Sequence, residues 1–190
     1  AGGTKGTLRS TFPPMSLPAW SSFLTGLEPG KHGIFDFTIL EKGSGKSRLV
    51  HSGFRAGKTV LRIASEAGMR VCCLGVPGTF PPEPLNGVMI SGFDAPVAQG
   101  PGRRSIYPSS FLREMDRLSL RFPFADFQET RVGKGWHEMA LKKLLRGVQE
   151  KARVAIYLLK KEEWDLFILV FGETDTVSHH FWCFMDSTSP

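Results

Sequence analysis

The sequence predicts a single α/β domain in which helices cover a mostly parallel sheet. Two near-continuous apolar runs, RVCCLGVPG at 70–78 and DLFILVFGETD at 165–175, are typical of strands buried on both faces. Each follows a stretch with apolar residues at helical spacing, at 57–68 and at 134–163. A helix followed by a short buried strand is the repeating unit of a parallel sheet. We therefore expect the ligand crevice at the carboxyl ends of the strands, where GETD follows the second run.

The composition is that of an ordinary globular chain with one core. Its 190 residues are 41% hydrophobic and 22% charged, so disorder is not expected. The formal net charge of +6 favours a phosphorylated or otherwise anionic partner, and specific nucleic-acid binding is not predicted. The longest clear apolar run, LFILVF, is far shorter than the roughly 18 residues of a membrane span, so no membrane partner is predicted.

The N-terminal part is predicted to begin with a short helix. The segment LPAWSSFLTGLEPG has an early proline and a late glycine, which places a helix at about 18–25 and leaves Ser16 at its N-terminal edge. KHGIFDFTIL at 31–40 is predicted to be extended, and the glycine-rich EKGSGKSR after it to be a polar loop. The segment 79–108 is rich in proline and glycine, which predicts a loop-rich insertion or active-face segment with a brief strand at VMI.

Three cysteines, Cys72, Cys73 and Cys183, give an odd number and no CxxC pair. A strand would point the two adjacent thiols to opposite faces, which disfavours a disulfide framework. We expect small buried thiols rather than a zinc site, and this pattern favours a reducing, cytoplasmic compartment.

Two stretches look like phosphate-binding loops, GSGKS at 43–47 and AGKT at 56–59. The phosphate loop needs a glycine five places before its second glycine, where this chain has Leu40 and Ser52. Neither stretch follows a convincing strand with a helix beginning at the lysine. We expect both to be flexible basic loops, not nucleotide sites.

ETDTVSHHFW, at 173–182, places Asp175 and His179 four residues apart directly after a predicted strand. On one turn of helix these side chains share a face, so a carboxylate oxygen and an imidazole nitrogen could meet one cation. This ligand chemistry suits zinc or manganese better than calcium. The alternative is that His179 or His180 caps the helix or packs beneath the neighbouring aromatic rings.

Ser16 also has two interpretations. It could be an N-cap whose hydroxyl accepts a backbone N–H bond. It could instead be a nucleophile, because a helix N-terminus stabilises an ionised hydroxyl or an attached phosphate.

Taken together, the two clusters resemble the type I phosphodiesterase/nucleotide pyrophosphatase family of the alkaline phosphatase superfamily. STFPPMSLPAWSSFLTGLEPGKHGIFDF, at 10–37, is similar to the nucleophile region of that family: a proline-rich approach, Thr or Ser, x-Pro, a helix ending in TG, and P-x-x-HGI. DLFILVFGETDTVSHHFW resembles its later metal-ligand segment, a hydrophobic strand followed by Asp-x-x-x-His. The resemblance implies a three-layer α/β/α, alkaline-phosphatase-like catalytic domain, of which residues 1–190 are the N-terminal part.

The resemblance also implies a metal-dependent hydrolase of phosphodiesters, nucleotide pyrophosphates or related small phosphate compounds. Ser16 matches the nucleophile, which becomes transiently phosphorylated and ligates one metal. Asp175 and His179 match ligands of the other metal, in a pair of divalent ions that is usually zinc, with manganese as the alternative. His32 matches a position that we interpret as structural.

The chain departs from the family pattern at several points. Many relatives have a phosphate-binding asparagine where this chain has Ala19 followed by Trp20, and Trp20 also disfavours a sulfatase, which needs arginine there. An upstream acidic ligand, a later Asp-His pair and a further His are absent, so the fragment alone is not expected to complete both metal sites. The rival interpretation is a catalytically inactive binding or interaction module.

Overall fold

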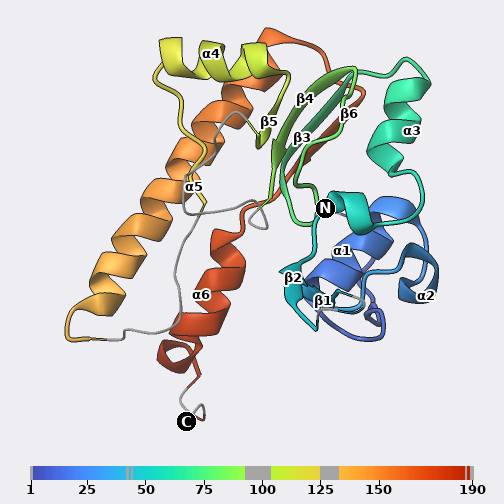
Figure 1. Ribbon diagram of the computed structural model, residues 1–190. Helices are drawn as coiled ribbons and strands as arrows, with labels where there is room; N and C mark the ends of the chain where they lie inside the picture. The colour runs from blue at the N-terminus through green and yellow to red at the C-terminus, as the bar shows by residue number, and fades with distance from the viewer. Residues whose placement is uncertain are drawn as a thin grey trace.

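The structure is a computed structural model, which describes residues 2–41, 43, 45–92, 104–124, 133–186 and 188. Its centre is a four-stranded sheet with the order β5-β4-β3-β6 (Figure 1). The central strand β3 (Val71–Val76) pairs in parallel with β4 (Gly87–Ser91) and with β6 (Leu166–Leu169), while β5 (Ile106–Tyr107) runs antiparallel to β4. The predicted α/β class with a mostly parallel sheet is therefore confirmed.

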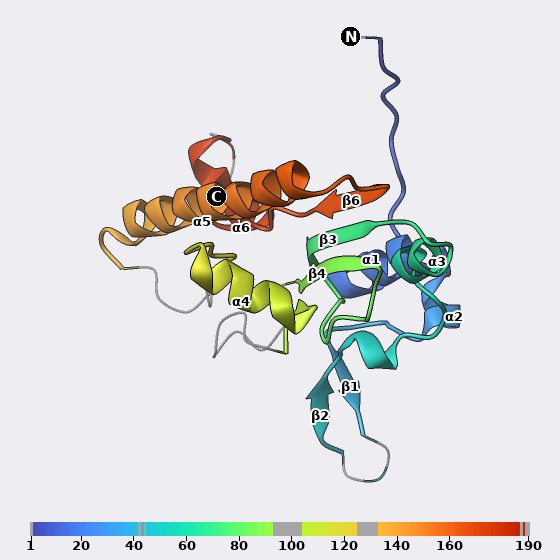
Figure 2. The same cartoon turned by 90° about the horizontal axis from the view of Figure 1, so that it is seen from above.

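Helices pack on both faces of this sheet, as the view from above shows (Figure 2). Cys72 and Leu74 point into a cluster with α4 (Ser109–Arg117) and α5 (Trp136–Lys161). Their neighbours on β3 point the other way, into a cluster with α1 (Ser16–Thr25) and α3 (Val60–Glu66). The alternation follows from the two-residue repeat of a strand, so the same apolar run serves two cores.

The two helices predicted at 57–68 and 134–163 are confirmed as α3 and α5. Helix α3 begins at Val60 because Thr59 caps it, with its hydroxyl accepting a hydrogen bond from the Arg62 backbone N–H at 3.0 Å. The sequence placed the first helix at about 18–25, whereas α1 begins two residues earlier, so Ser16 is its first residue rather than its flank.

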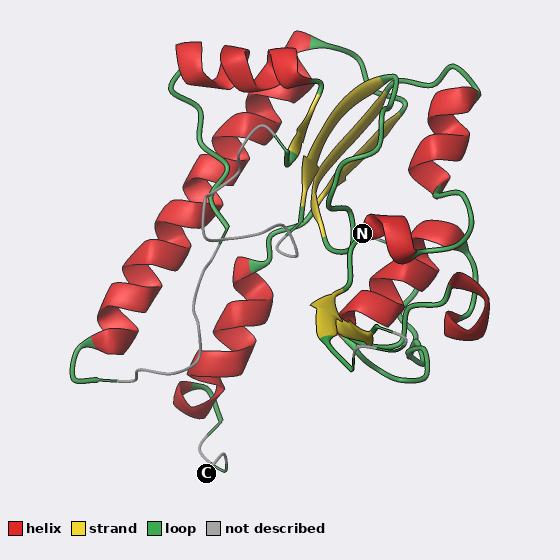
Figure 3. Ribbon diagram, in the orientation of Figure 1, coloured by secondary structure: helices red, strands yellow, loops and turns green. Residues whose placement is uncertain are grey.

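The extended segment predicted at 31–40 is wrong in its first half. Residues Pro29–His32 form the short helix α2, which ends at Gly33 with φ 80°, and only Thr38–Leu40 form a strand, β1. Strand β1 pairs antiparallel with β2 (Ser47–Leu49) in an exposed hairpin apart from the main sheet (Figure 3). This hairpin replaces part of the expected polar loop, of which residues 42 and 44 lie outside the described residues.

Other differences concern the later part of the chain. Strand β6 is half-buried rather than buried, since it is an edge strand with β3 as its one neighbour in the sheet. The brief strand expected at VMI is confirmed within β4, but β5 and α4 were not predicted. Of the loop-rich segment 79–108, residues 93–103 lie outside the described part of the chain.

The cysteines divide between core and surface. Cys72 and Cys73 are buried on opposite faces of the sheet, as expected, and burial raises the pKa of the Cys73 thiol to about 12. Cys183 is exposed, so the expectation of a third buried thiol is wrong. It belongs to the short 3₁₀ helix η3 (Trp182–Phe184), which has no buried residue. No helix in the described ranges has the length and apolar character needed to cross a bilayer.

Candidate active site at the carboxyl edge of the sheet

Ser16 opens helix α1 with its hydroxyl available. The residue before it, Met15, is extended and provides no side-chain cap, and Ser16 itself is half-buried. Within the described part of the chain, the Ser16 hydroxyl makes no hydrogen bond. The N-cap interpretation required such a bond to a backbone N–H, so it is not what the structure has.

The first turn of α1 lies against the carboxyl end of β3. Gly78 belongs to the loop that leaves β3, and a Cβ at this glycine would be 3.9 Å from Leu17 Cδ2 and 3.8 Å from Ser21 Oγ. Leu17 is the next residue after Ser16 and is buried. The start of α1 is therefore at the sheet edge where ligands of open α/β folds bind.

Helix α6 (Glu173–Phe181) begins at the same edge, because β6 is parallel to β3. The Val170 backbone N–H donates to Leu74 O at 2.9 Å, and the chain enters α6 three residues later. Figure 1 shows both α1 and α6 below the sheet, beyond the carboxyl ends of β3 and β6. The two sequence clusters, about 160 residues apart in the chain, thus belong to elements on one side of the fold.

Asp175 and His179 share a face of α6, as their spacing predicted. His179 Nε2 lies 3.8 Å from Asp175 Oδ1, and the two side chains are 72% and 70% exposed. His180 is the one that packs against an aromatic ring, 5.1 Å from the ring of Trp136. The packing alternative therefore applies to His180 and not to His179.

The separation of His179 Nε2 and Asp175 Oδ1 is compatible with two ligands of one zinc or manganese ion. Tetrahedral zinc with bonds of about 2.0–2.2 Å holds two ligand atoms roughly 3.4 Å apart, and a small side-chain rotation would bring the observed 3.8 Å to that value. Among the residues that the structure describes, no cluster of three or more His, Cys, Asp or Glu side chains could hold a metal ion. The described residues thus include two candidate ligands and no complete metal site.

A buried ion pair that the sequence did not predict holds the start of α6. Lys151 Nζ on α5 lies 2.9 Å from Glu173 Oε1 and 3.0 Å from Oε2, with side-chain exposures of 4% and 3%. The lysine donates a hydrogen bond to Oε2, while Oε1 has no hydrogen-bond partner among the described residues. Lys151 follows Leu144 and Gly147 on the buried stripe of α5. In the sequence, a lysine within this apolar stripe is the signal that it has a buried acidic partner.

The ion pair leaves no room for a side chain at Gly147. A Cβ there would lie 2.7 Å from Glu173 Oε1, so we expect Gly147→Ala to lower the free energy of unfolding. The helix-propensity gain of about 1 kcal/mol is outweighed by overpacking, for a net loss of about 1–2 kcal/mol. Urea denaturation measures it, with Gly30→Ala in α2 as the control, because a Cβ at Gly30 meets nothing within 4 Å. An unchanged or higher stability of Gly147→Ala would contradict the close fit.

His32 is buried beneath α1. The Ile34 backbone N–H donates to His32 Nδ1 at 3.1 Å, so the protonated Nε2 donates to Ser22 Oγ at 3.0 Å. Burial is the main cause that lowers the pKa of His32 below 6.5. These contacts join α2 to α1 and agree with a structural role.

The lowered pKa of His32 predicts a pH dependence of stability. Below pH 6.5 the unfolded chain takes up a proton that the folded imidazole resists, so the free energy of unfolding should fall as the pH falls from 6.5 towards the folded pKa. Above pH 6.5 this contribution is fully present. Thermal unfolding of wild type and His32→Gln on both sides of pH 6.5 measures it. If stability changes with pH equally in both proteins, His32 is not the source of the pH dependence.

Comparison with known proteins identifies the family of the chain. Searches of curated proteins and of solved structures found no match to the chain. A family profile described as type I phosphodiesterase / nucleotide pyrophosphatase matches residues 1–189. The match includes Ser16 and the Asp175–His179 pair, the two clusters found at one edge of the sheet. The chain therefore belongs to the type I phosphodiesterase/nucleotide pyrophosphatase family.

Proposed function

We propose that the protein hydrolyses a phosphodiester, a nucleotide pyrophosphate or a related phosphate compound, through a covalent intermediate on Ser16. Membership of the family suggests phosphodiesterase or nucleotide pyrophosphatase activity in general. The observation that supports the finer proposal is the unbonded Ser16 hydroxyl at the start of α1, on the same sheet edge as Asp175 and His179.

The chemistry assigned to Ser16 is an in-line displacement at phosphorus. Its Oγ forms a bond to phosphorus while the bond from phosphorus to the leaving oxygen breaks, and the hydroxyl proton is lost to solvent. Water then attacks the phosphoserine, the bond between Oγ and phosphorus breaks, and a phosphomonoester or phosphate leaves. The N-terminal end of α1 favours the negative charge on Oγ and on the attached group.

The residues present fit a partial metal centre. Asp175 and His179 would hold one divalent cation, and Ser16 Oγ would contact a second. Cations held there would supply charge neutralisation for the attacking and leaving oxygens. As part of this proposal, the chain is the N-terminal part of a three-layer, alkaline-phosphatase-like domain. An acidic ligand, an Asp-His pair and a further His would then come from parts of that domain beyond 1–190.

The rival, a catalytically inactive binding module, is favoured by one observation. Trp20 packs against the core cluster that includes Leu24, and Ala19 has no polar atoms in its side chain, so neither replaces the phosphate-binding asparagine of many relatives. Under the catalytic proposal, backbone N–H groups or another side chain must contact the phosphate instead.

Metal binding and hydrolysis together test the proposal. We expect the full-length protein to cleave bis-p-nitrophenyl phosphate when Zn²⁺ or Mn²⁺ is supplied, and to lose this activity in Asp175→Ala. Calorimetric titration with Zn²⁺ should show weaker binding by at least about tenfold in that variant. Asp116→Ala is the matched control, since Asp116 is an exposed helical carboxylate that pairs with Arg121. If Zn²⁺ binds neither protein and no diester is cleaved, the binding module is the better interpretation.

A further inference from the structure

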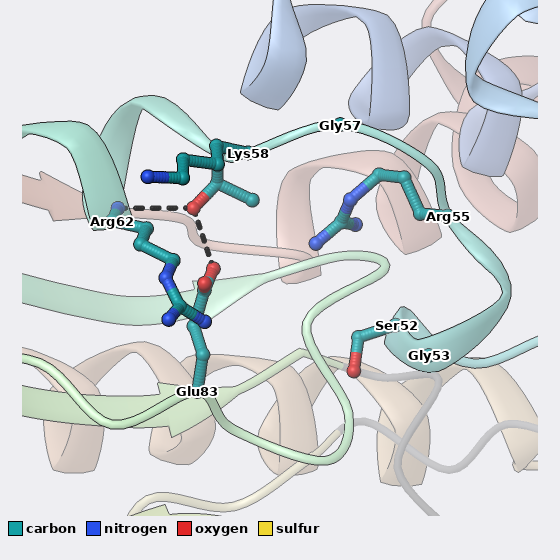
Figure 4. A pocket seen from close by; sticks show the side chains of 8 residues that line it. Ser52, Gly53, Arg55, Gly57, Lys58, Arg62 and Glu83 are labelled. Atoms are coloured by element: carbon teal, nitrogen blue, oxygen red, sulfur yellow. Dashed lines mark hydrogen bonds between the residues drawn. The ribbon is translucent and has the colours of Figure 1, made fainter.

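Three cationic side chains line a surface pocket that includes neither Ser16 nor the pair on α6. The pocket has a volume of about 330 Å³ and lies between the 3₁₀ helix η1 (Ser52–Phe54) and the start of α3 (Figure 4). Arg55, Lys58 and Arg62 line it, with Glu83 as the one acidic side chain in the lining. The lining therefore has two net positive charges, which favours an anionic ligand.

The two arginines approach the pocket from different elements, Arg55 from the segment after η1 and Arg62 from α3 (Figure 4). Arg55 Nη1 donates to Gly78 O at 2.6 Å, a bond that fixes the direction of the guanidinium. Arg62 Nε donates to Glu66 Oε1 at 2.9 Å. Lys58 Nζ lies 2.7 Å from the other oxygen of the same Glu66. Both pairs are solvent-exposed, so water screens them and a ligand can compete with them.

Glu83 is held on the pocket wall by a short chain of hydrogen bonds. The buried Thr59 hydroxyl donates to Glu83 Oε1 at 2.6 Å and accepts from the Arg62 backbone N–H at 3.0 Å, as the dashed lines in Figure 4 show. The carboxylate is thus fixed near the cations and lowers their attraction for an anion. Removing the charge of Glu83 alone should strengthen anion binding, whereas the loss of an arginine should weaken it.

The AGKT stretch at 56–59 supplies part of this pocket. Gly57, Lys58 and Thr59 all line it, although their spacing does not match a phosphate-binding loop. Gly57 has φ 90°, and a Cβ there would lie 2.6 Å from Leu27 Cδ1, so this glycine fixes the path of the segment. The stretch is therefore a wall of the pocket, and its last residue, Thr59, caps α3.

We propose that this pocket binds the phosphate group of a phosphorylated ligand, as a second anion site of the protein. Guanidinium groups match phosphate oxygens in geometry and charge, and a pocket of this size accepts a group of that kind. The inference goes beyond the proposed function and does not need Ser16 to be catalytic. Its test is a binding measurement, so a failed hydrolysis assay leaves it unaffected.

Titration with inorganic phosphate and pyrophosphate, followed by the arginine Nε–H signals in ¹H–¹⁵N NMR spectra at constant ionic strength, tests the proposal. We expect Arg62→Gln to weaken phosphate binding by about tenfold, since a charge-assisted contact is lost. Glu83→Gln, which keeps an acceptor for Thr59, should strengthen it several-fold. Arg121→Gln is the matched control, because Arg121 is an exposed arginine paired with a carboxylate outside the pocket. Equal dissociation constants in all four proteins, or weaker binding by Glu83→Gln, would overturn the proposal.

A second arm distinguishes the free ion from a phosphate group on a larger molecule. Glycerol 2-phosphate is titrated in the same way as inorganic phosphate. Similar dissociation constants for the two, both weakened by Arg62→Gln, would assign the pocket to the phosphate end of a larger ligand. Binding of inorganic phosphate alone, with the same sensitivity to Arg62→Gln, would assign it to the free ion.

Discussion

Ser16→Ala is expected to lower kcat/KM for bis-p-nitrophenyl phosphate by about 10³-fold or more in the full-length protein with Zn²⁺ or Mn²⁺. Under the proposed mechanism, the substitution removes the attacking oxygen. The fold should stay unchanged, since the hydroxyl makes no hydrogen bond within the described residues. The free energy of unfolding should therefore change by less than about 0.5 kcal/mol. Steady-state kinetics and urea denaturation measure the two quantities.

Ser109→Ala is the matched control for this experiment. Ser109 is the first residue of α4, after a residue without a side-chain cap, just as Ser16 is the first residue of α1. We expect the control to retain wild-type kcat/KM. A loss of activity in Ser16→Ala that accompanies a comparable loss of stability would assign Ser16 a structural role instead.

Lys151→Met is expected to have the largest effect on stability, a loss of about 3–5 kcal/mol. Methionine fills much of the volume of lysine but leaves the Glu173 carboxylate buried without its counter-charge. Because Glu173 is the first residue of α6, the loss should also loosen the helix that presents Asp175 and His179. Urea denaturation measures the first effect, and amide hydrogen exchange in α6 measures the second.

Two further variants show whether the ion pair is the cause. Lys142→Met, at an exposed position of the same helix, should change stability by less than about 0.5 kcal/mol. The double variant Lys151→Met with Glu173→Leu removes both charges, and we expect it to recover most of the loss. If the double variant is as unstable as Lys151→Met alone, packing at this site and not the unpaired carboxylate explains the effect.

The parts of the fold that depend on periodic apolar patterns could be predicted from the sequence. The run at 70–78 became β3 because it is apolar on both faces, and the pattern at 134–163 became α5 because its apolar residues form a helical stripe. Helix α4 was not predicted, although its buried Phe111 and Met115 lie four residues apart, the spacing of one helix face. The exposed hairpin of β1 and β2 has no buried face to produce an alternating pattern.

The candidate site was predictable where it depends on local spacing. Asp175 and His179 meet because i and i+4 lie on one face of any helix, and Ser16 opens α1 because proline near it favours a helix start. The pairing of Lys151 with Glu173 could not be predicted, since it depends on how α5 crosses α6. The pocket beside α3 could not be predicted either, because Arg55 and Glu83 line it from segments that meet only in the folded chain.

Trapping the intermediate on Ser16 tests the proposed mechanism most directly. The full-length protein with Zn²⁺ is mixed with bis-p-nitrophenyl phosphate, quenched in acid within one turnover, and digested for mass spectrometry. The peptide containing Ser16 should gain the mass of one p-nitrophenyl phosphoryl group as one p-nitrophenolate is released. Ser16→Ala should show no such gain. Rapid release of p-nitrophenolate by the wild type with the group on another residue, or with undiminished turnover in Ser16→Ala, would contradict the assignment of Ser16 as the nucleophile.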